Sequence, residues 1–260
     1  MAACLLAAAG CGGEDAGAPP HSETYTLNSK VLDVDLDQVI VREGRGRPLL
    51  VLLHGKDGQP GDFYGKTLDS TLRALGAEAP NVLMPAGGAS SYWHNRRDGE
   101  WGRYLLHEAI PEAIAKTGAD AKRIAIGGFS MGGFGALALA LAHPGYFCAA
   151  GGHAPALWKA ARATAPGAFD DPADFKRHDL LAAAKDGWPF GSTRIWLDVD
   201  THDPFRATTT ELARELGSRA RFTVWPGTHS TSYIRRHLPQ TLRWYAAALA
   251  ACKSGRPGDA

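Results

Sequence analysis

The chain has 260 residues, of which 45% are apolar and 21% charged, and its formal net charge at neutral pH is +1. This length allows one large domain that buries roughly 70–75% of the surface of the unfolded chain, and the composition is that of an ordinary globular protein. The near-zero charge gives no support to nucleic-acid binding or to a polybasic membrane patch.

Residues 1–22 differ from the rest, and we expect them to form a leader and a disordered tether. The stretch MAACLLAAAGC is small and apolar, and a polar GGEDAGAPP follows it. It resembles the end of a bacterial secretion signal with an Ala-Ala-Gly-Cys lipobox, in which Cys11 would carry a lipid anchor. No Lys or Arg precedes the apolar run, as one does in a standard signal peptide; a start site placed too late would explain this. We expect export, with a cytoplasmic location as the alternative, and the run is too short to span a bilayer.

Residues 23–252 are expected to form a single domain, followed by a disordered tail at 253–260. Hydrophobic patterning predicts strands at 31–41, 49–53, 81–84, 123–126, 147–151, 194–199 and 221–225. It predicts helices at 66–75, 102–116 with a kink or break at Pro111, 136–142, 172–185, 208–216 and 232–251. The first strand alternates like an antiparallel edge strand. The alternation of strands and helices implies an α/β fold, a mostly parallel sheet with helices on both faces, and sites in such sheets lie beyond the carboxyl ends of the strands.

The stretch Gly127–Gly135, GGFSMGGFG, places five glycines around one serine. Gly128-x-Ser130-x-Gly132 matches the nucleophile elbow, in which a serine sits on a sharp turn between a strand and a helix with its hydroxyl exposed. The alternative is a glycine-rich turn, or a helix start capped by the serine. The predicted strand before this stretch and the predicted helix after it favour the elbow.

A serine hydroxyl is a weak nucleophile, so it needs a base and a group that orients the base. In elbow proteins the acid and then the histidine follow the serine along the chain. His229 lies in the loop between the last predicted strand and the last predicted helix, which makes it the predicted base. Asp203, in the loop before Pro204, is the predicted acid, with Asp200 as its main rival.

The same chemistry requires donors for the developing oxyanion. The backbone N–H of Met131, the residue after the serine, is the first predicted donor. The second is the N–H of Lys56, in the loop that follows the strand at 49–53.

Beyond the leader, Cys148 and Cys252 are the remaining cysteines. Cys148 lies in an apolar run and is expected to be a small core residue, and two cysteines do not make a disulfide framework or a zinc site. Nothing in the sequence indicates a metal, nucleotide or flavin cofactor.

With these motifs the chain resembles the α/β-hydrolase superfamily, and within it the putative esterase family of esterase D-like enzymes and antigen 85 mycolyltransferases. The likeness covers roughly residues 45–250. Besides GFSMGG, the stretch LMPAGGASSY at 83–92 is similar to the Met-Pro-Val-Gly-Gly-x-Ser-Ser-Phe stretch of antigen 85, and residues 101–111 are similar to its Trp-Glu-x-Phe-Leu…Glu-Leu-Pro run. The resemblance implies an acyl-enzyme mechanism with Ser130, Asp203 and His229.

Two departures limit what the resemblance implies. Asp200 stands where the family often has glycine in the acid turn, so the choice between Asp200 and Asp203 stays open. Residues 93–97 diverge from antigen 85, so specificity for trehalose and mycolate is not carried over. Tyr92, Trp93 and His94 follow a strand end and are candidate substrate contacts in the cleft; simple packing is the alternative.

Three functions are therefore in competition. The first is a serine esterase that hydrolyses a small-molecule or carbohydrate ester. The second is an acyltransferase that moves the acyl group to a sugar or another alcohol. The third is a non-catalytic exported binding protein, which would have no use for a strained turn costing about 1–3 kcal/mol.

Overall fold

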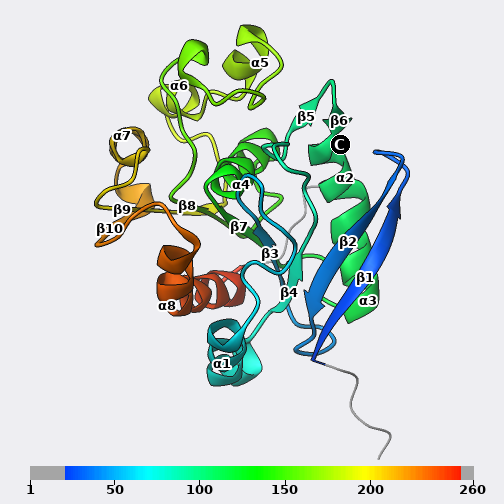
Figure 1. Ribbon diagram of the computed structural model, residues 1–260. Coiled ribbons are helices and arrows are strands. Elements are labelled where there is room, and N and C mark those ends of the chain that lie inside the picture. Colours follow the sequence, from blue (N-terminus) through cyan, green and yellow to red (C-terminus); the bar gives the residue numbers. More distant parts are fainter. Residues whose placement is uncertain (1–20, 253–260) are drawn as a thin grey trace, which may run out of the picture.

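The computed structural model describes residues 21–252 (Figure 1). Cys11, with the rest of residues 1–20, and the tail at 253–260 lie outside the described residues. An eight-stranded sheet runs through the centre in the order β1-β2-β4-β3-β7-β8-β9-β10. Its strands are β1 (Ser22–Ser29), β2 (Val34–Val41), β3 (Leu49–Leu53), β4 (Asn81–Met84), β7 (Ile124–Phe129), β8 (Ala149–His153), β9 (Arg194–Asp200) and β10 (Ala220–Trp225); the small hairpin of β5 (Asn95–Arg96) and β6 (Gly99–Glu100) stands apart.

The sheet is mostly parallel, as the alternation of elements predicted. β3, β4, β7, β8, β9 and β10 all run in one direction, whereas β2 is antiparallel to β4 and β1 is antiparallel to β2. The prediction of an edge strand at 31–41 was wrong in its position. β2 begins only at Val34, and β1, which the sequence reading missed, covers its outer side.

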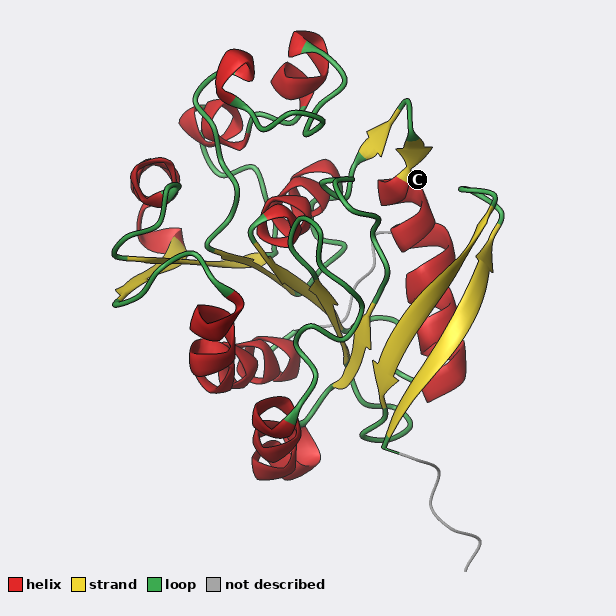
Figure 2. Cartoon of the chain, viewed as in Figure 1, coloured by secondary structure: helices red, strands yellow, loops and turns green. Residues whose placement is uncertain are grey.

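Helices cover both faces of the sheet (Figure 2). They are α1 (Lys66–Leu75), α2 (Trp101–Tyr104), α3 (Ile110–Thr117), α4 (Met131–Ala142), α5 (Pro172–Arg177), α6 (Leu180–Lys185), α7 (Arg206–Leu216) and α8 (Thr231–Ala250), with one π-helical turn at Leu105–Ala109. Because successive side chains of β3 point to opposite faces, Leu50 packs in the core formed with α1 and α8. Val51 packs in the core formed with α3, α4, α6 and α7. No helix at residues 21–252 combines the length and apolarity needed to cross a membrane.

Two predicted helices are not single regular α-helices in the structure. The helix at 102–116 is continuous over residues 101–117 but includes the π-helical turn, and Pro111, which has no N–H to donate, lies just after that turn. The helix at 172–185 divides into α5 and α6, each beginning at an aspartate cap: Asp171 accepts from the N–H of Asp174, and Asp179 from that of Ala182.

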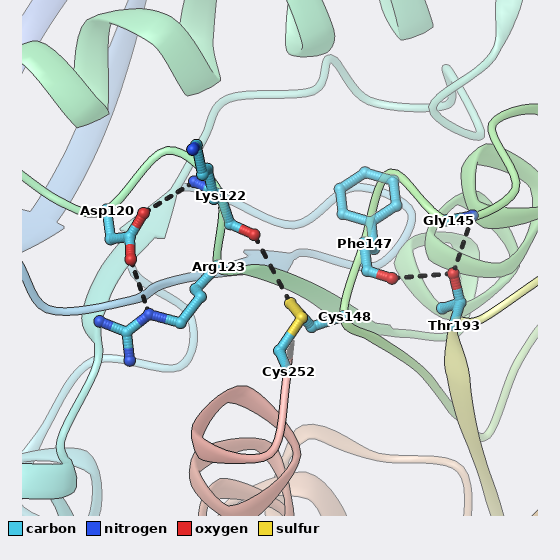
Figure 3. Close-up of a disulfide and its surroundings, with 8 residues drawn as sticks. All are labelled: Asp120, Lys122, Arg123, Gly145, Phe147, Cys148, Thr193 and Cys252. Carbon is cyan, nitrogen blue, oxygen red and sulfur yellow. Dashed lines mark hydrogen bonds and ion pairs between the residues drawn. A yellow bond between two sulfur atoms is a disulfide. The ribbon is translucent and has the colours of Figure 1, made fainter. Parts of the chain in front are cut away.

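Cys148 and Cys252 form a disulfide with their Cα atoms 5.6 Å apart (Figure 3). The bond ties the residue just before β8 to the residue that follows the last turn of α8. Cys148 is buried, as expected, but the sequence reading did not anticipate its bond to Cys252. The 104-residue separation gave no sign of the contact, because the contact arises only when α8 packs back against the sheet.

Candidate active site

Ser130 occupies a strained bend between β7 and α4. Its φ of 54° and ψ of −113° are unfavourable for a residue with a side chain. The flanking glycines are required sterically: a Cβ on Gly132 would lie 2.0 Å from the carbonyl oxygen of Leu53, and one on Gly128 would lie 2.5 Å from the backbone of Gly132. The glycines therefore let the bend pass directly against the end of β3.

Backbone hydrogen bonds hold this bend in place. The N–H of Ser130 donates to the carbonyl of His153 at the end of β8 (3.0 Å). The carbonyl of Ser130 accepts from the N–H of Phe134 (2.9 Å) and from that of Ala156 (3.0 Å). The strain at Ser130 is thus offset by contacts to both the following helix and the neighbouring strand.

Three of the predicted residues lie in one hydrogen-bonded row. His229 Nε2 is 2.8 Å from Ser130 Oγ, and His229 Nδ1 is 2.6 Å from Asp203 Oδ2. His229 lies in the loop between β10 and α8, and Asp203 in the loop after β9, so three carboxyl ends of parallel strands meet here. The other oxygen of Asp203 accepts from the N–H of Phe205 (2.7 Å), which fixes the orientation of the carboxylate.

Asp200, the rival acid, lies behind this row. One of its oxygens accepts from the N–H of His202 (3.0 Å), whereas Oδ2 is buried without a hydrogen-bond partner among residues 21–252. Burial raises the pKa of Asp200 to about 6, and the nearby Asp203 carboxylate adds to the shift. The direct contact with the imidazole belongs to Asp203.

The two predicted oxyanion donors follow the ends of the adjacent parallel strands β7 and β3. Met131 is the first residue of α4, so its N–H has no partner within the helix. The N–H of Lys56 makes no hydrogen bond to any described residue. The loop of Lys56 passes the serine closely, since a Cβ on Gly55 would lie 3.6 Å from the Cβ of Ser130. The ammonium of Lys56 is engaged separately, with the Asp57 carboxylate at 2.7 Å.

A pocket of about 230 Å³ adjoins the row, and sequence reasoning missed most of its lining. Phe129 connects the two, because it precedes the serine and its ring centroid lies 4.7 Å from that of His229. Phe63, Phe129 and Ile234 give the pocket apolar walls. The lining residues are His54, Gly55, Lys56, Asp57, Gly58, Gln59, Asp62, Phe63, Phe129, Thr231 and Ile234. The sequence signals for this pocket were the position of Phe129 beside the serine and the loop of Lys56 after the strand at 49–53.

The prediction that Tyr92, Trp93 and His94 line the cleft is corrected. All three are at most 3% exposed, and none lines the pocket beside Ser130. Tyr92 and Trp93 both have positive φ, of 50° and 60°, and this backbone turns their side chains inward. Trp93 fills the space beside Gly135, where a Cβ would lie 2.4 Å from the Trp93 Cβ.

A second histidine and aspartate pair, which the sequence did not reveal, lies beneath the bend. His153 Nδ1 is 2.5 Å from Asp198 Oδ2, and His153 Nε2 is 2.9 Å from the hydroxyl of Tyr245. The hydroxyl of Tyr233 donates to the other oxygen of Asp198 (2.8 Å). Room for Tyr245 exists because Gly151 has no side chain: a Cβ there would lie 1.8 Å from the tyrosine oxygen.

Comparison with known proteins agrees with this architecture. The family model described as "Putative esterase" matches residues 33–245. Esterase Rv1288 of Mycobacterium tuberculosis (strain ATCC 25618 / H37Rv) is 34% identical over 122 residues, which are 42% of this chain and 25% of that protein. The MPT51 antigen of Mycobacterium leprae (strain TN) is 38% identical over 89 residues, which are 33% of this chain and 29% of that protein. The matches thus span less than a third of the length of these relatives.

Solved structures extend the likeness to most of the described chain. A ferulic acid esterase has a TM-score of 0.76 to this structure at 20% sequence identity, over 87% of this chain and 97% of that one. An identity this low speaks for the fold alone. The family match and the shared architecture lead to one conclusion: the chain belongs to the putative esterase family and has the α/β-hydrolase fold.

Proposed function

We propose that this protein is a serine esterase that hydrolyses a carboxylic ester through an acyl-enzyme. The observation that carries the proposal is the row of Ser130 Oγ, His229 and Asp203, with contacts of 2.8 and 2.6 Å. Membership of the putative esterase family supports esterase or acyltransferase chemistry for such a row.

In the proposed reaction, His229 Nε2 removes the hydroxyl proton as Ser130 Oγ attacks the ester carbonyl. Asp203 keeps the second imidazole proton on Nδ1 and stabilises the imidazolium. The N–H groups of Met131 and Lys56 stabilise the oxyanion, each worth about 10²–10³ in rate. His229 then protonates the departing alcohol, and water, activated by the same imidazole, releases the acid and regenerates Ser130.

We infer that the pocket beside Phe129 receives one half of the ester. Its volume of about 230 Å³ and its walls of Phe63, Phe129 and Ile234 suit an apolar group of limited size. Substrates of the class we expect are small-molecule or carbohydrate esters with one such group.

The test is labelling with a fluorophosphonate probe, which reacts with an activated serine. We expect the wild type and the control Ser232→Ala, which removes an exposed hydroxyl near the site, to label equally. Ser130→Ala should not label. Labelling that survives Ser130→Ala would contradict the proposal, as would an unlabelled wild type, which would favour a binding protein. A panel of p-nitrophenyl esters of rising acyl length would then define the pocket.

An acyltransferase is the second candidate, supported by the resemblance of residues 83–92 and 101–111 to antigen 85 mycolyltransferases. Both candidates share the acyl-enzyme and differ in the acceptor, water or an alcohol. Measuring product partition with and without added sugars and alcohols separates them: transfer products exceeding the statistical share of the alcohol would favour the transferase.

We further propose that the protein is exported and anchored through Cys11. The Cys148–Cys252 disulfide supports export, because disulfides persist in oxidising compartments. Fractionation of cells expressing the full chain, compared with Cys11→Ser, tests this: the wild type should partition with the envelope and the variant should not.

A further inference from the structure

A second cluster of potential ligands lies away from Ser130. It consists of His94 in the loop after β4, Asp174 in α5, and His178 at the end of α5. Their donor atoms all lie within 4.8 Å of one another. His94 Nε2 is 3.3 Å from Asp174 Oδ2, and His178 Nδ1 is 3.2 Å from Asp174 Oδ1.

The two ring nitrogens of His94 face two acceptor oxygens. Nδ1 faces the carbonyl oxygen of Tyr92 at 3.4 Å, and Nε2 faces the carboxylate of Asp174 at 3.3 Å. Both neighbours are acceptors, whereas a neutral imidazole carries a single N–H. With the proton on Nε2, the ring donates to the carboxylate, whereas with the proton on Nδ1 the lone pair of Nε2 points at a carboxylate oxygen. In the second tautomer, a cation between these two atoms would satisfy both.

A second proton on His94 would be costly in this position. The ring of His178 lies 4.4 Å away, centroid to centroid, and His94 is buried. The guanidinium of Arg177 already contacts the Asp174 carboxylate at 3.1 Å. A metal ion could take the place of that second proton between His94 Nε2 and Asp174. It bonds directly to the nitrogen and to the carboxylate, so no charged imidazolium is placed in the interior.

The cluster is compact enough for one small ion. Ligand atoms about 2.0–2.2 Å from a common Zn²⁺ lie roughly 3.3–3.6 Å apart in a tetrahedron. The histidines now face different oxygens of Asp174, and His178 Nδ1 also faces the backbone carbonyl of Asp174 at 3.0 Å, so binding one ion requires these side chains to rotate slightly. Asp174 and His178 are four residues apart, which brings their side chains to the same side of the helix.

An ion could reach the cluster from a neighbouring pocket. This pocket has a volume of about 270 Å³, and four histidines contribute to its lining: His94, His107, His143 and His178. It would leave space for water in the fourth coordination position. The remaining contacts of Asp174 are compatible with binding: the N–H of Asp170 donates to Oδ2 (2.9 Å), and the mostly exposed Arg177 can move aside.

We propose that His94, Asp174 and His178 form a binding site for a divalent transition metal ion of the zinc type. The ion would join the loop after β4 to α5, with His94 Nε2, a carboxylate oxygen of Asp174 and a ring nitrogen of His178 as ligands. This site is separate from the proposed esterase reaction and does not depend on it.

The test is calorimetric titration of the chelator-treated full chain with ZnCl₂. We expect one equivalent to bind to the wild type. His178→Ala should weaken binding by more than about 100-fold, because loss of even a supporting partner outside the ligand set costs about 10–100-fold. His178 is partly exposed, so we expect this variant to fold, and circular dichroism of the metal-free protein checks that it does. The second variant is Asp174→Asn, which keeps the side-chain volume and should also weaken zinc binding.

Two controls separate this site from others. His143→Ala removes a histidine that lines the same pocket outside the cluster and should keep the equivalent. His229→Ala disrupts the group of Asp200, Asp203 and His229, the other group within residues 21–252 that could hold an ion. This variant should also still bind one equivalent of zinc. No binding by the folded wild type would overturn the proposal, and so would binding that His229→Ala abolishes or that His178→Ala leaves unchanged.

Discussion

The molecule contains two histidine and aspartate pairs of nearly identical local geometry. In the first, His229 Nδ1 is 2.6 Å from Asp203 and Nε2 is 2.8 Å from the hydroxyl of Ser130. In the second, His153 Nδ1 is 2.5 Å from Asp198 and Nε2 is 2.9 Å from the hydroxyl of Tyr245. The side chain of His229 is 23% exposed and that of His153 is 4% exposed.

What separates the pairs is access and the third partner. The first pair lies on loops beyond the strand ends, beside a pocket, and its hydroxyl stands on a strained bend. The second pair lies between β8, β9 and α8, and burial raises the pKa of Tyr245 well above its usual value, so this hydroxyl keeps its proton. The same arrangement of imidazole, carboxylate and hydroxyl therefore occurs once beside a pocket and once in the buried interior, where we expect it to stabilise the fold.

The largest expected effect comes from Asp203→Asn. The amide cannot hold the required imidazole tautomer, so we expect kcat for an activated ester to fall by about 10³–10⁴. Stability should change little. Steady-state kinetics together with thermal unfolding checks this. A fall of less than tenfold in a folded variant would assign the acid role elsewhere, with Asp200 as the first alternative.

The matching change in the buried pair, Asp198→Ala, should act on stability. It removes the partner of both His153 and Tyr233, and breaking a buried pair of this kind costs about 3–5 kcal/mol. Denaturant unfolding measures the loss, and fluorophosphonate labelling below the unfolding transition should persist. Intact stability with lost labelling would show that the buried pair takes part in the chemistry.

Asp200→Asn should change how the free energy of unfolding depends on pH. The folded-state pKa of about 6 exceeds the value of roughly 4 in the unfolded chain, so folding takes up a proton between these pH values. The contribution of this group to the free energy of unfolding therefore falls as pH rises from about 4 to about 6, by up to about 3 kcal/mol. The variant should lose this dependence. Denaturant unfolding of both proteins at pH 4.5 and 7.5 checks it, and parallel pH profiles would contradict it.

Tyr245→Phe is the mildest change. It removes one oxygen and leaves His153 Nε2 without its partner, which should cost about 1–3 kcal/mol. The free energy of unfolding should fall by this amount while kcat stays within about twofold. A large fall in kcat instead would mean that the contact of α8 with His153 helps to position the bend at Ser130.

The sequence predicted the first pair and could not predict the second. Ser130, Asp203 and His229 follow strand ends in the order that the elbow architecture requires, so topology alone brought them together. His153 and Asp198 lie inside strands, and their pairing depends on which strands are neighbours and on the glycines that admit Tyr245. Neither is visible in local patterning.

The apolar walls of the pocket could also not be predicted from the sequence. Aromatic residues after a strand end were reasonable candidates, yet positive φ at Tyr92 and Trp93 turned them inward. The pocket is instead built from Phe63, Phe129 and Ile234, on three separate segments. β1 was not predicted because most of its residues are polar and partly exposed. Its two faces therefore differ little in hydrophobicity.

The Cys148–Cys252 link has a consequence for how the molecule comes apart. The ends of helices that pack on a sheet can fray, but here the C-terminal end of α8 is covalently held at the start of β8. His229 lies within the closed ring and Ser130 just outside it. The C-terminal end of α8 therefore cannot leave the start of β8 unless a reductant cuts the bond.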